Sequence, residues 1–302
     1  MTSLRIRFLS KTYPNGVHAL RDISLNIPAG MFGLLGPNGA GKSTLMRTLA
    51  TLQEPDGGTV HLGDLDVLRQ KERVRETLGY LPQDFGVPKD VTAEKLLAHF
   101  AVLEGITNRG ERHEIVEGLL RQTNLWDARR QKLGGYSGGM RQRFGIAVAL
   151  LGNPRLLIVD EPTAGLDPAE RVRFLNLLGE LGENSVVILS THIVEDVAEL
   201  CTRMAIINKG TILLEAEPLR AVDELRGRVW ERFASKEELP SLEREHTVLS
   251  TKLLAGRTLV RVLSDSAPSP AFRAAEADLQ DVYFSVMAGQ YERSAAALQV
   301  AR

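Results

Sequence analysis

Residues 36–43 are Gly36-Pro37-Asn38-Gly39-Ala40-Gly41-Lys42-Ser43 and fit the pattern G-x-x-x-x-G-K-[ST], a loop that wraps nucleotide phosphates. The glycines permit backbone angles closed to other residues, so successive NH groups can converge on an anion. Lys42 adds a positive charge for the terminal phosphates, and Ser43 offers a hydroxyl to Mg²⁺. The loop, continued by Thr44, therefore predicts a site for ATP or GTP with Mg²⁺.

The flanking sequence supplies the context that this loop requires. Residues 31–35 form an uncharged run typical of a strand buried on both faces. After the loop, residues 42–52 carry apolar side chains at helical spacing, namely Leu45, Met46, Leu49 and Leu52. A helix that begins at Lys42 directs its positive end at the bound anion. The sequence thus predicts the strand, loop and helix of a P-loop NTPase.

Composition limits the classes of partner. The chain has 302 residues, enough for about two domains, with 37 basic and 38 acidic side chains and a net charge of −1. This balance lacks the positive field of a nucleic-acid binder, so we expect no DNA or RNA partner. The single cysteine, Cys201, cannot form an internal disulfide, and its apolar neighbours indicate a buried packing residue.

Hydropathy indicates a cytoplasmic chain. Residues 4–8 alternate between apolar and charged, which is typical of a half-buried strand and differs from the apolar core of a signal peptide. No apolar run reaches the roughly 18 residues needed to span a bilayer. Any role at a membrane is therefore expected to come through another chain.

The pattern of strands and helices predicts an α/β fold in two domains. Residues 4–8 and 18–27 alternate around the turn Pro14-Asn15-Gly16 and predict an antiparallel β subdomain. Residues 156–159 and 186–189 predict central parallel strands. The helix between these strands is expected to bury a stripe formed by Val172, Leu175, Leu178 and Leu181.

Two further segments complete this organisation. The strand signal disappears from about residue 88 to 152, where Leu96, Leu97, Phe100 and Leu103 recur at helical spacing and predict a helical insertion. We expect a nucleotide-binding domain over residues 1–225 and a small α+β domain over residues 226–302. In the latter, residues 258–263 predict a strand, and a closing amphipathic helix carries Leu279, Val282, Tyr283 and Val286.

A second set of candidate residues follows the strand at 156–159. The strand ends in Asp160-Glu161, and ligands of open α/β sheets bind at the carboxyl ends of the strands. Asp160 is predicted to hold Mg²⁺. Glu161 is predicted to orient or deprotonate the water that attacks the γ-phosphate.

Residues 136–143 are Tyr136-Ser137-Gly138-Gly139-Met140-Arg141-Gln142-Arg143, ahead of an apolar helix. This stretch resembles the signature sequence of the ATP-binding cassette (ABC) family. The resemblance implies that Ser137, Gly138 and Gly139 offer hydroxyl and NH groups to a γ-phosphate held by a second subunit. Tyr136 and Met140 replace the commonest residues of the signature, and this variant resembles the ATPases of drug and antibiotic exporters.

The resemblance covers about residues 4–214 and assigns four further positions. Tyr13 is similar to the aromatic residue that stacks on adenine, and Gln83 to the magnesium and water sensor that faces the membrane partner. Asp167 is similar to the residue that links the sites of the two subunits. His192 is similar to the histidine that contacts the γ-phosphate.

The resemblance also implies partners and a location. Two copies are expected to pair head to tail, with each ATP between the Lys42 loop of one copy and Ser137 to Gly139 of the other. A separate transmembrane permease is expected to dock near Gln83 and the helical insertion and to carry an exported substrate. The chain would then be cytoplasmic and peripheral on the inner face of the cell membrane.

Several other interpretations remain to be tested by structure. Gly135-Tyr136-Ser137-Gly138-Gly139 also fits the nucleophile elbow of α/β-hydrolases, but the charged residues 128–132 before it do not suit the strand that this elbow needs. Asp84-Phe85-Gly86 imitates the kinase metal motif without other kinase elements. A soluble cassette ATPase acting on ribosomes or DNA, and a nucleotide-gated binding protein without turnover, are alternatives to transport. The basic residues near the signature are expected to form a solvated face: Arg129, Arg130, Lys132, Arg141 and Arg143.

Overall fold

The computed structural model describes residues 2–181 and 185–291. The chain separates into two compact units, Met1–Thr202 with Ile207–Ile212, and Arg203–Ile206 with Leu213–Arg302. Among the described residues, no helix combines the length and the apolar character that a membrane crossing requires.

The first unit begins with an antiparallel sheet of strand order β2-β1-β4-β5. Its strands are β1 (Ser3–Thr12), β2 (His18–Pro28), β4 (Gly57–Leu62) and β5 (Leu65–Asp66). Leu4 and Ile6 of β1 are buried, whereas Arg5 and Arg7 are exposed. The alternation in the sequence therefore produces one buried face, and the predicted antiparallel subdomain is confirmed.

A second sheet has the strand order β10-β9-β3-β8-β7-β6, and the boundary between the two units falls within β9 (Arg203–Asn208) and β10 (Thr211–Ala216). Its parallel pairs join β3 (Gly30–Leu35), β8 (Val186–Thr191), β7 (Leu156–Asp160) and β6 (Leu78–Leu81). Every residue of β7 and β8 is buried. Uncharged runs predict such strands because both faces of the sheet are covered.

Helices cover these sheets. Helix α1 (Lys42–Leu49) packs between them, with contacts to β2, β7 and β8. The short helix α2 (Lys71–Arg75) precedes β6, α6 (Pro168–Leu181) lies between β7 and β8 in sequence, and α7 (Val194–Leu200) follows β8. The predicted stripe of α6 is wrong at Val172, which is 54% exposed. The helix buries the expected Leu175 and Leu178 together with Phe174 and Leu177. Its buried face is therefore rotated about the helix axis, away from Val172.

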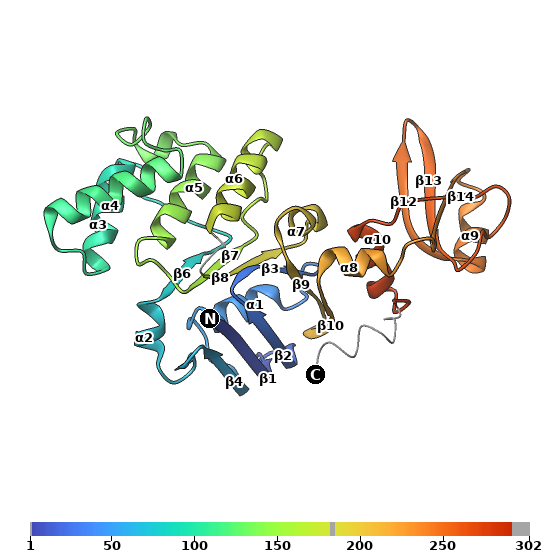
Figure 1. Ribbon diagram of the computed structural model, residues 1–302, viewed down its shortest axis with the longest axis horizontal. Coiled ribbons are helices and arrows are strands. Elements are labelled where there is room, and N and C mark those ends of the chain that lie inside the picture. The colour runs from blue at the N-terminus through green and yellow to red at the C-terminus, as the bar shows by residue number, and fades with distance from the viewer. Residues whose placement is uncertain (1, 182–184, 292–302) are drawn as a thin grey trace. The chain divides into compact units, whose positions relative to one another are not determined.

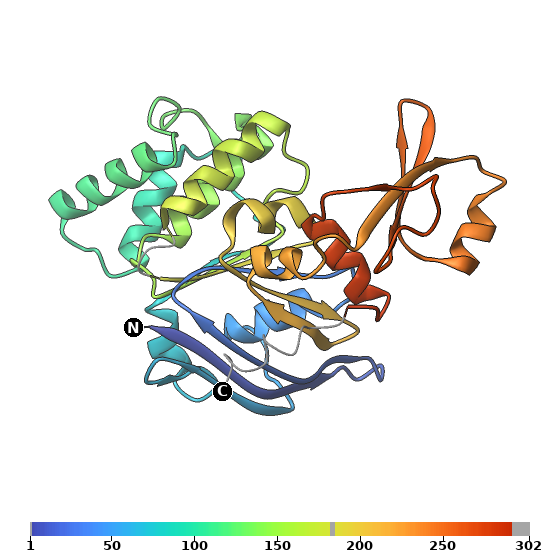
Figure 2. The same ribbon diagram turned by 45° about the vertical axis from the view of Figure 1, so that its right-hand side comes forward.

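The helical insertion consists of α3 (Ala93–Leu103), α4 (Arg109–Gln122), a 3₁₀ turn (Leu133–Gly135) and α5 (Gly138–Ala149). In Figures 1 and 2 these helices lie on the opposite side of the central strands from β1, β2 and β4. They enclose their own core around Leu97, Leu120 and Phe144. Leu103, expected in the apolar stripe of α3, is 68% exposed because it ends the helix.

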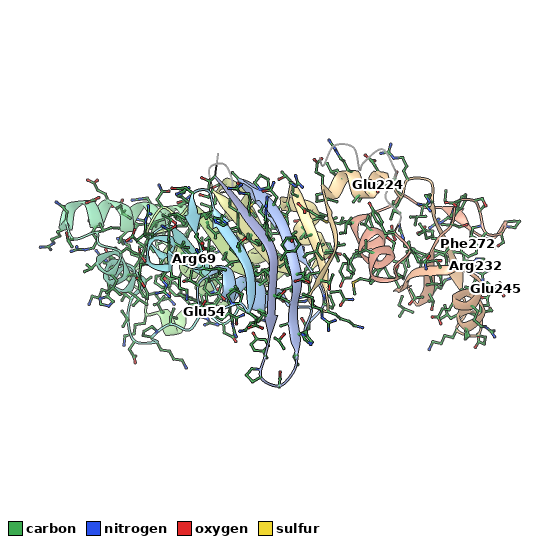
Figure 3. The ribbon with its side chains drawn as sticks, turned by 90° about the horizontal axis from the view of Figure 1, so that it is seen from below. Glu54, Arg69, Glu224, Arg232, Glu245 and Phe272 are labelled. Carbon is green, nitrogen blue, oxygen red and sulfur yellow. The ribbon has the colours of Figure 1, made fainter. Side chains whose placement is uncertain are left out.

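The second unit contains a four-stranded sheet of order β12-β13-β11-β14. Its elements are α8 (Pro218–Asp223), β11 (Val229–Ala234), α9 (Leu239–Glu245), β12 (Thr247–Leu254), β13 (Arg257–Leu263), β14 (Arg273–Ala274) and α10 (Leu279–Met287). A small core forms around Leu242, Val260, Val262 and Phe272, and Figure 3 shows Arg232 beside Phe272, where the guanidinium lies 5.5 Å from the ring centroid. The predicted strand and closing helix are both present.

Cys201 follows α7 and is buried. Burial, assisted by the charge of Asp196, raises the pKa of its thiol to about 12. A thiol that stays protonated at neutral pH is a packing group, as the sequence predicts.

The core of the helical insertion yields a stability prediction. Phe144 is fully buried and its ring lies 6.3 Å from that of Phe85. We expect Phe144→Ala to lower the free energy of unfolding by about 3–5 kcal/mol, since the vacated volume cannot be refilled. Leu103→Ala on the same insertion is the control and should change it by about 0.5 kcal/mol or less. Equal losses of unfolding free energy in the two variants, measured by denaturant melts, would contradict this packing.

Candidate functional site

Four parallel strands end at one edge of the central sheet, and each is followed by a predicted site residue. The order β3-β8-β7-β6 places the loop at residues 36–43 first, then His192, then Asp160 with Glu161, and finally Gln83. Residues far apart in the sequence thus meet because the carboxyl ends of parallel strands share an edge.

The loop at residues 36–43 has two positions that require glycine. Gly41 has φ +109°, and a Cβ there would lie 2.4 Å from the Ala19 carbonyl oxygen. A Cβ at Gly36 would lie 2.4 Å from the carbonyl oxygen of Ile207. Ala40 accepts a backbone hydrogen bond of 2.8 Å from Gly210. The chain therefore packs the loop backbone tightly from behind, which fixes the direction of its NH groups.

Lys42 is the charged centre of the site and is only 5% exposed. Its Nζ donates to the carbonyl oxygens of Gly36 at 2.7 Å and Pro37 at 3.3 Å. It also lies 3.1 Å from Oε1 of Glu161. A buried ammonium needs such partners, so the loop and the end of β7 together hold its position.

Glu161 connects the loop with the end of β8. Its backbone is left-handed, with φ +48°, and its NH donates to the Ser190 carbonyl oxygen at 2.8 Å. The carboxylate is 7% exposed, and Oε2 lies 2.5 Å from Nδ1 of His192. This backbone conformation is strained for a side chain other than glycine and is typical of functional sites. The arrangement places a proton acceptor beside an imidazole and a buried ammonium.

Asp160 lies beneath these groups and is 3% exposed. Burial raises the pKa of its carboxyl group above the ordinary value, against the lowering influence of the nearby Ser190 and Ser43 hydroxyls. Within residues 2–181 and 185–291, its Oδ1 is buried without a hydrogen-bond partner, and no cluster of three or more His, Cys, Asp or Glu side chains could hold a metal. One carboxylate oxygen beside a serine hydroxyl suits a cation whose other ligands are phosphates and water.

Lys42 and Glu161 line a cavity of about 720 Å³ that extends from the loop to Tyr13 and Gln83, whereas Asp160 and His192 are not among its lining residues. Asn38, Gly39, Ser43 and Thr44 also line it. The Tyr13 hydroxyl lies 3.2 Å from Oγ1 of Thr44 and 3.2 Å from Oε1 of Gln53. Its ring is therefore anchored at the rim, and the cavity is large enough for a nucleotide.

The predicted signature residues form a separate group. Ser137 caps α5 by accepting a hydrogen bond of 3.1 Å from the Met140 NH, and Gly138 is exposed. Neither residue lines the cavity beside Lys42; Gly138 lines another of about 440 Å³, together with Gln83 and Gly165. Asp167 lines neither cavity, and its Oδ1 accepts from the Glu170 NH at 2.9 Å.

The start of α5 also corrects one expectation. Arg143 is 6% exposed and pairs with Glu170 at 2.6 Å, so it does not belong to a solvated face. A Cβ on Gly139 would lie 2.3 Å from Oε2 of Glu170, so a larger residue would have to displace this carboxylate from Arg143. Tyr136 fits the helical core and donates to the Ala128 carbonyl oxygen at 3.0 Å.

The nucleophile-elbow interpretation is not supported. A 3₁₀ turn at Leu133–Gly135 precedes Ser137, and along the described chain no strand enters that residue. The elbow requires a strand that ends at the serine.

Sequence reasoning missed a buried polar cluster around Asp196, which is 0% exposed. Its carboxylate accepts from Thr163 at 2.5 Å, from Arg171 at 2.7 Å and from Thr191 at 3.3 Å. The available signal was an acidic residue among the apolar neighbours Val194 and Val197 on one short helix, where a charge is unexpected.

Known proteins resemble this chain over most of its length. The profile of the ABC transporter family matches residues 20–164. An uncharacterized ABC transporter ATP-binding protein of Bacillus subtilis, YxlF, is 32% identical over 309 residues, which cover 94% of this chain and 99% of that protein. The daunorubicin/doxorubicin resistance ATP-binding protein DrrA of Streptomyces peucetius is 39% identical over 68% of this chain; the match spans 63% of DrrA.

Solved structures agree in fold. The dimeric ATP-binding cassette MJ0796 in a post-hydrolysis state, bound to ADP and Pi, has a TM-score of 0.65 and 26% identity over 71% of this chain and 98% of that one. The P-loop core with its β subdomain and helical insertion is thus the fold of ABC cassettes. The chain belongs to the ABC transporter family and is the ATP-binding, ATP-hydrolysing subunit of an ABC transporter.

Proposed function

We propose that two copies of this chain pair head to tail, and that each ATP lies between the Lys42 loop of one copy and Ser137 to Gly139 of the other. The observation that carries the proposal is that Tyr13, Lys42 and Glu161 line the large cavity, whereas the signature residues Ser137 and Gly138 do not. The dimeric state of MJ0796 with ADP and Pi supports it. Binding of ATP would close the pair, and hydrolysis would let it reopen.

The chemistry follows from the positions of three side chains. Lys42 would stabilise the charge on the terminal phosphates, since its ammonium is held at the loop and shielded from water. Glu161 would orient and deprotonate the attacking water, and His192, within 2.5 Å of Glu161, would contact the γ-phosphate. Tyr13 would stack on the adenine from the rim of the cavity.

The residues present also fit Mg²⁺. Asp160 has a buried oxygen without a partner among the described residues, and the Ser43 hydroxyl lies beside this carboxyl. Ser43 and Asp160 would hold the ion, with Gln83 at the edge between the two cavities. Mg²⁺ supplies charge neutralisation of the phosphates when it is bound.

The wider proposal is that hydrolysis drives export through a separate membrane permease. DrrA is named for drug resistance, and YbhF of Escherichia coli is named a probable multidrug ABC transporter protein. The permease would dock near Gln83 and the helical insertion, which would hold the chain on the inner face of the membrane without any nucleic acid. Export and docking rest on family likeness.

The role of Glu161 can be tested by substitution. We expect Glu161→Gln to bind ATP but to lose turnover by about 100-fold or more, because an amide cannot accept the proton of water.

Lys42→Ala should lose both binding and turnover. ATP affinity and phosphate release would be measured with Mg²⁺, alone and with the cognate permease.

Glu243→Gln is the matched control, since Glu243 is an exposed acid on α9 of the second unit. It should behave as the wild type. Normal turnover by Glu161→Gln would remove Glu161 from its proposed role, and unchanged ATP affinity of Lys42→Ala would contradict the phosphate-loop assignment.

Complementation tests the head-to-tail arrangement. In the proposed dimer, each ATP site combines the loop of one copy with the signature residues of the other. Lys42→Ala damages the loop half of a site, and Gly138→Asp damages the signature half. Within a single chain, no atom lies within 4 Å of a Cβ at Gly138, so the new side chain has room. Random pairing of the two inactive variants should leave roughly a quarter of all sites with both halves intact, so phosphate release should reappear on mixing. If each site used the loop and signature of one chain, mixing would restore nothing.

The proposed domain boundary at residues 225–226 gives a further prediction. All predicted site residues precede it. The cut separates α10 from α8, on which it packs, but neither helix carries a predicted site residue. We therefore expect a chain truncated after residue 225 to keep ATP hydrolysis. Loss of ATP affinity or dimer formation, measured by titration and light scattering, would show that residues 226–302 support the site.

A further inference from the structure

Asp196 is buried beneath the site and belongs to no proposed step. It lies on α7, its carboxylate is 0% exposed, and its side-chain neighbours in the helix include the buried Val194 and Val197. Burying a carboxylate is costly unless it is paired and hydrogen-bonded. The three donors that meet this carboxylate therefore indicate what the position is for.

The first two donors are hydroxyl groups on the two segments that carry Glu161 and His192. The Thr163 Oγ1, two residues after Glu161, donates to Oδ2 at 2.5 Å. The Thr191 Oγ1, next to His192, donates to the same oxygen at 3.3 Å. One carboxylate oxygen therefore joins the end of β7 to the end of β8.

The Thr191 hydroxyl has a second contact that bears on His192. Its oxygen accepts a hydrogen bond of 3.0 Å from the Ile193 NH. The residues on both sides of His192 are thereby tied to one hydroxyl, whose orientation is fixed by Asp196. The imidazole in turn lies 2.5 Å from Glu161.

The third donor is Arg171, whose Nε lies 2.7 Å from Oδ1 of Asp196. Burial alone lowers the pKa of this guanidinium, but the hydrogen bond and charge of Asp196, with Glu199 and Glu195, raise it above its ordinary value. Arg171 also donates its backbone NH to the Asp167 carbonyl oxygen at 2.9 Å. The same acid thus reaches the start of α6, where Asp167 lies.

We propose that Asp196 is a positioning residue for ATP hydrolysis, which holds the segments of Glu161 and His192 in register so that their side chains meet. It touches neither nucleotide nor water and acts through Thr163 and Thr191. The inference rests on the proposed roles of Glu161 and His192. Positioning of this kind affects turnover more than binding, because displacement of a reacting group by about 1 Å can cost 100-fold in rate.

The test is Asp196→Asn, which keeps the shape of the side chain and removes its charge. The amide oxygen can still face Arg171, and the amide nitrogen must then face the two hydroxyls, which have to turn. We expect kcat for ATP hydrolysis to fall about 10- to 100-fold, while the Kd for ATP stays within about threefold. Asp281→Asn is the matched control, since Asp281 of the second unit is equally buried and pairs with Arg261 at 2.6 Å; its kcat should stay near that of the wild type.

Two more experiments separate positioning from general stability. Thr163→Val removes one hydroxyl without changing volume and should lower kcat, whereas Thr163→Ser should restore it. In a His192→Ala background, Asp196→Asn should lower kcat much less than in the wild type, since the Glu161–His192 contact is already lost. The Thr163 measurements stay decisive if Asp196→Asn folds poorly, because these two variants disturb only one hydrogen bond.

The outcomes distinguish this inference from the function on which it rests. If Glu161→Gln and His192→Ala lose turnover while Asp196→Asn and Thr163→Val keep it, the positioning role is wrong and the proposed function stands. If His192→Ala itself keeps normal turnover, the proposed role of His192 fails first. Equal losses from Asp196→Asn in both backgrounds, or parallel losses of kcat and ATP affinity, would make Asp196 a structural residue only.

Discussion

The burial of one positive charge constrains most of this site. Lys42 is 5% exposed, and its ammonium is tolerable there only because oxygen atoms surround it. Two of these oxygens come from the backbone of its own loop, and the third comes from Glu161. The loop at residues 36–43 must therefore curl back on its lysine, and the end of β7 must lie within reach of it.

The parallel sheet provides that reach. β3 and β7 both pair with β8, so the loop after β3 and the acids after β7 lie on either side of the residue that follows β8. The left-handed backbone at Glu161 then turns its carboxylate toward both Lys42 and His192. Strain at this residue is tolerated because the backbone bond to Ser190 and both carboxylate contacts determine its conformation together.

Much of this arrangement can be predicted from the sequence because it depends on local patterns. Uncharged runs identify the central strands, and the glycine pattern identifies the loop between β3 and α1. What cannot be predicted depends on which side of a helix turns inward. Val172 and Leu103 fit the apolar spacing of their helices but are exposed, whereas Arg143 and Asp196 are charged but buried. Each buried charge has a partner from a distant segment, Glu170 for Arg143 and Thr163 for Asp196, and spacing along the chain does not reveal such pairs.

The glycines of the signature stretch differ in what they require. At Gly139 the constraint lies within a single chain, because a Cβ there would have to displace the Glu170 carboxylate from Arg143. At Gly138 a Cβ would meet no atom within 4 Å, and the backbone is not left-handed. The contacts within one chain therefore do not require a glycine at this position. In the proposed dimer, the close approach of a phosphate held by a second copy would favour a residue without a side chain at this position.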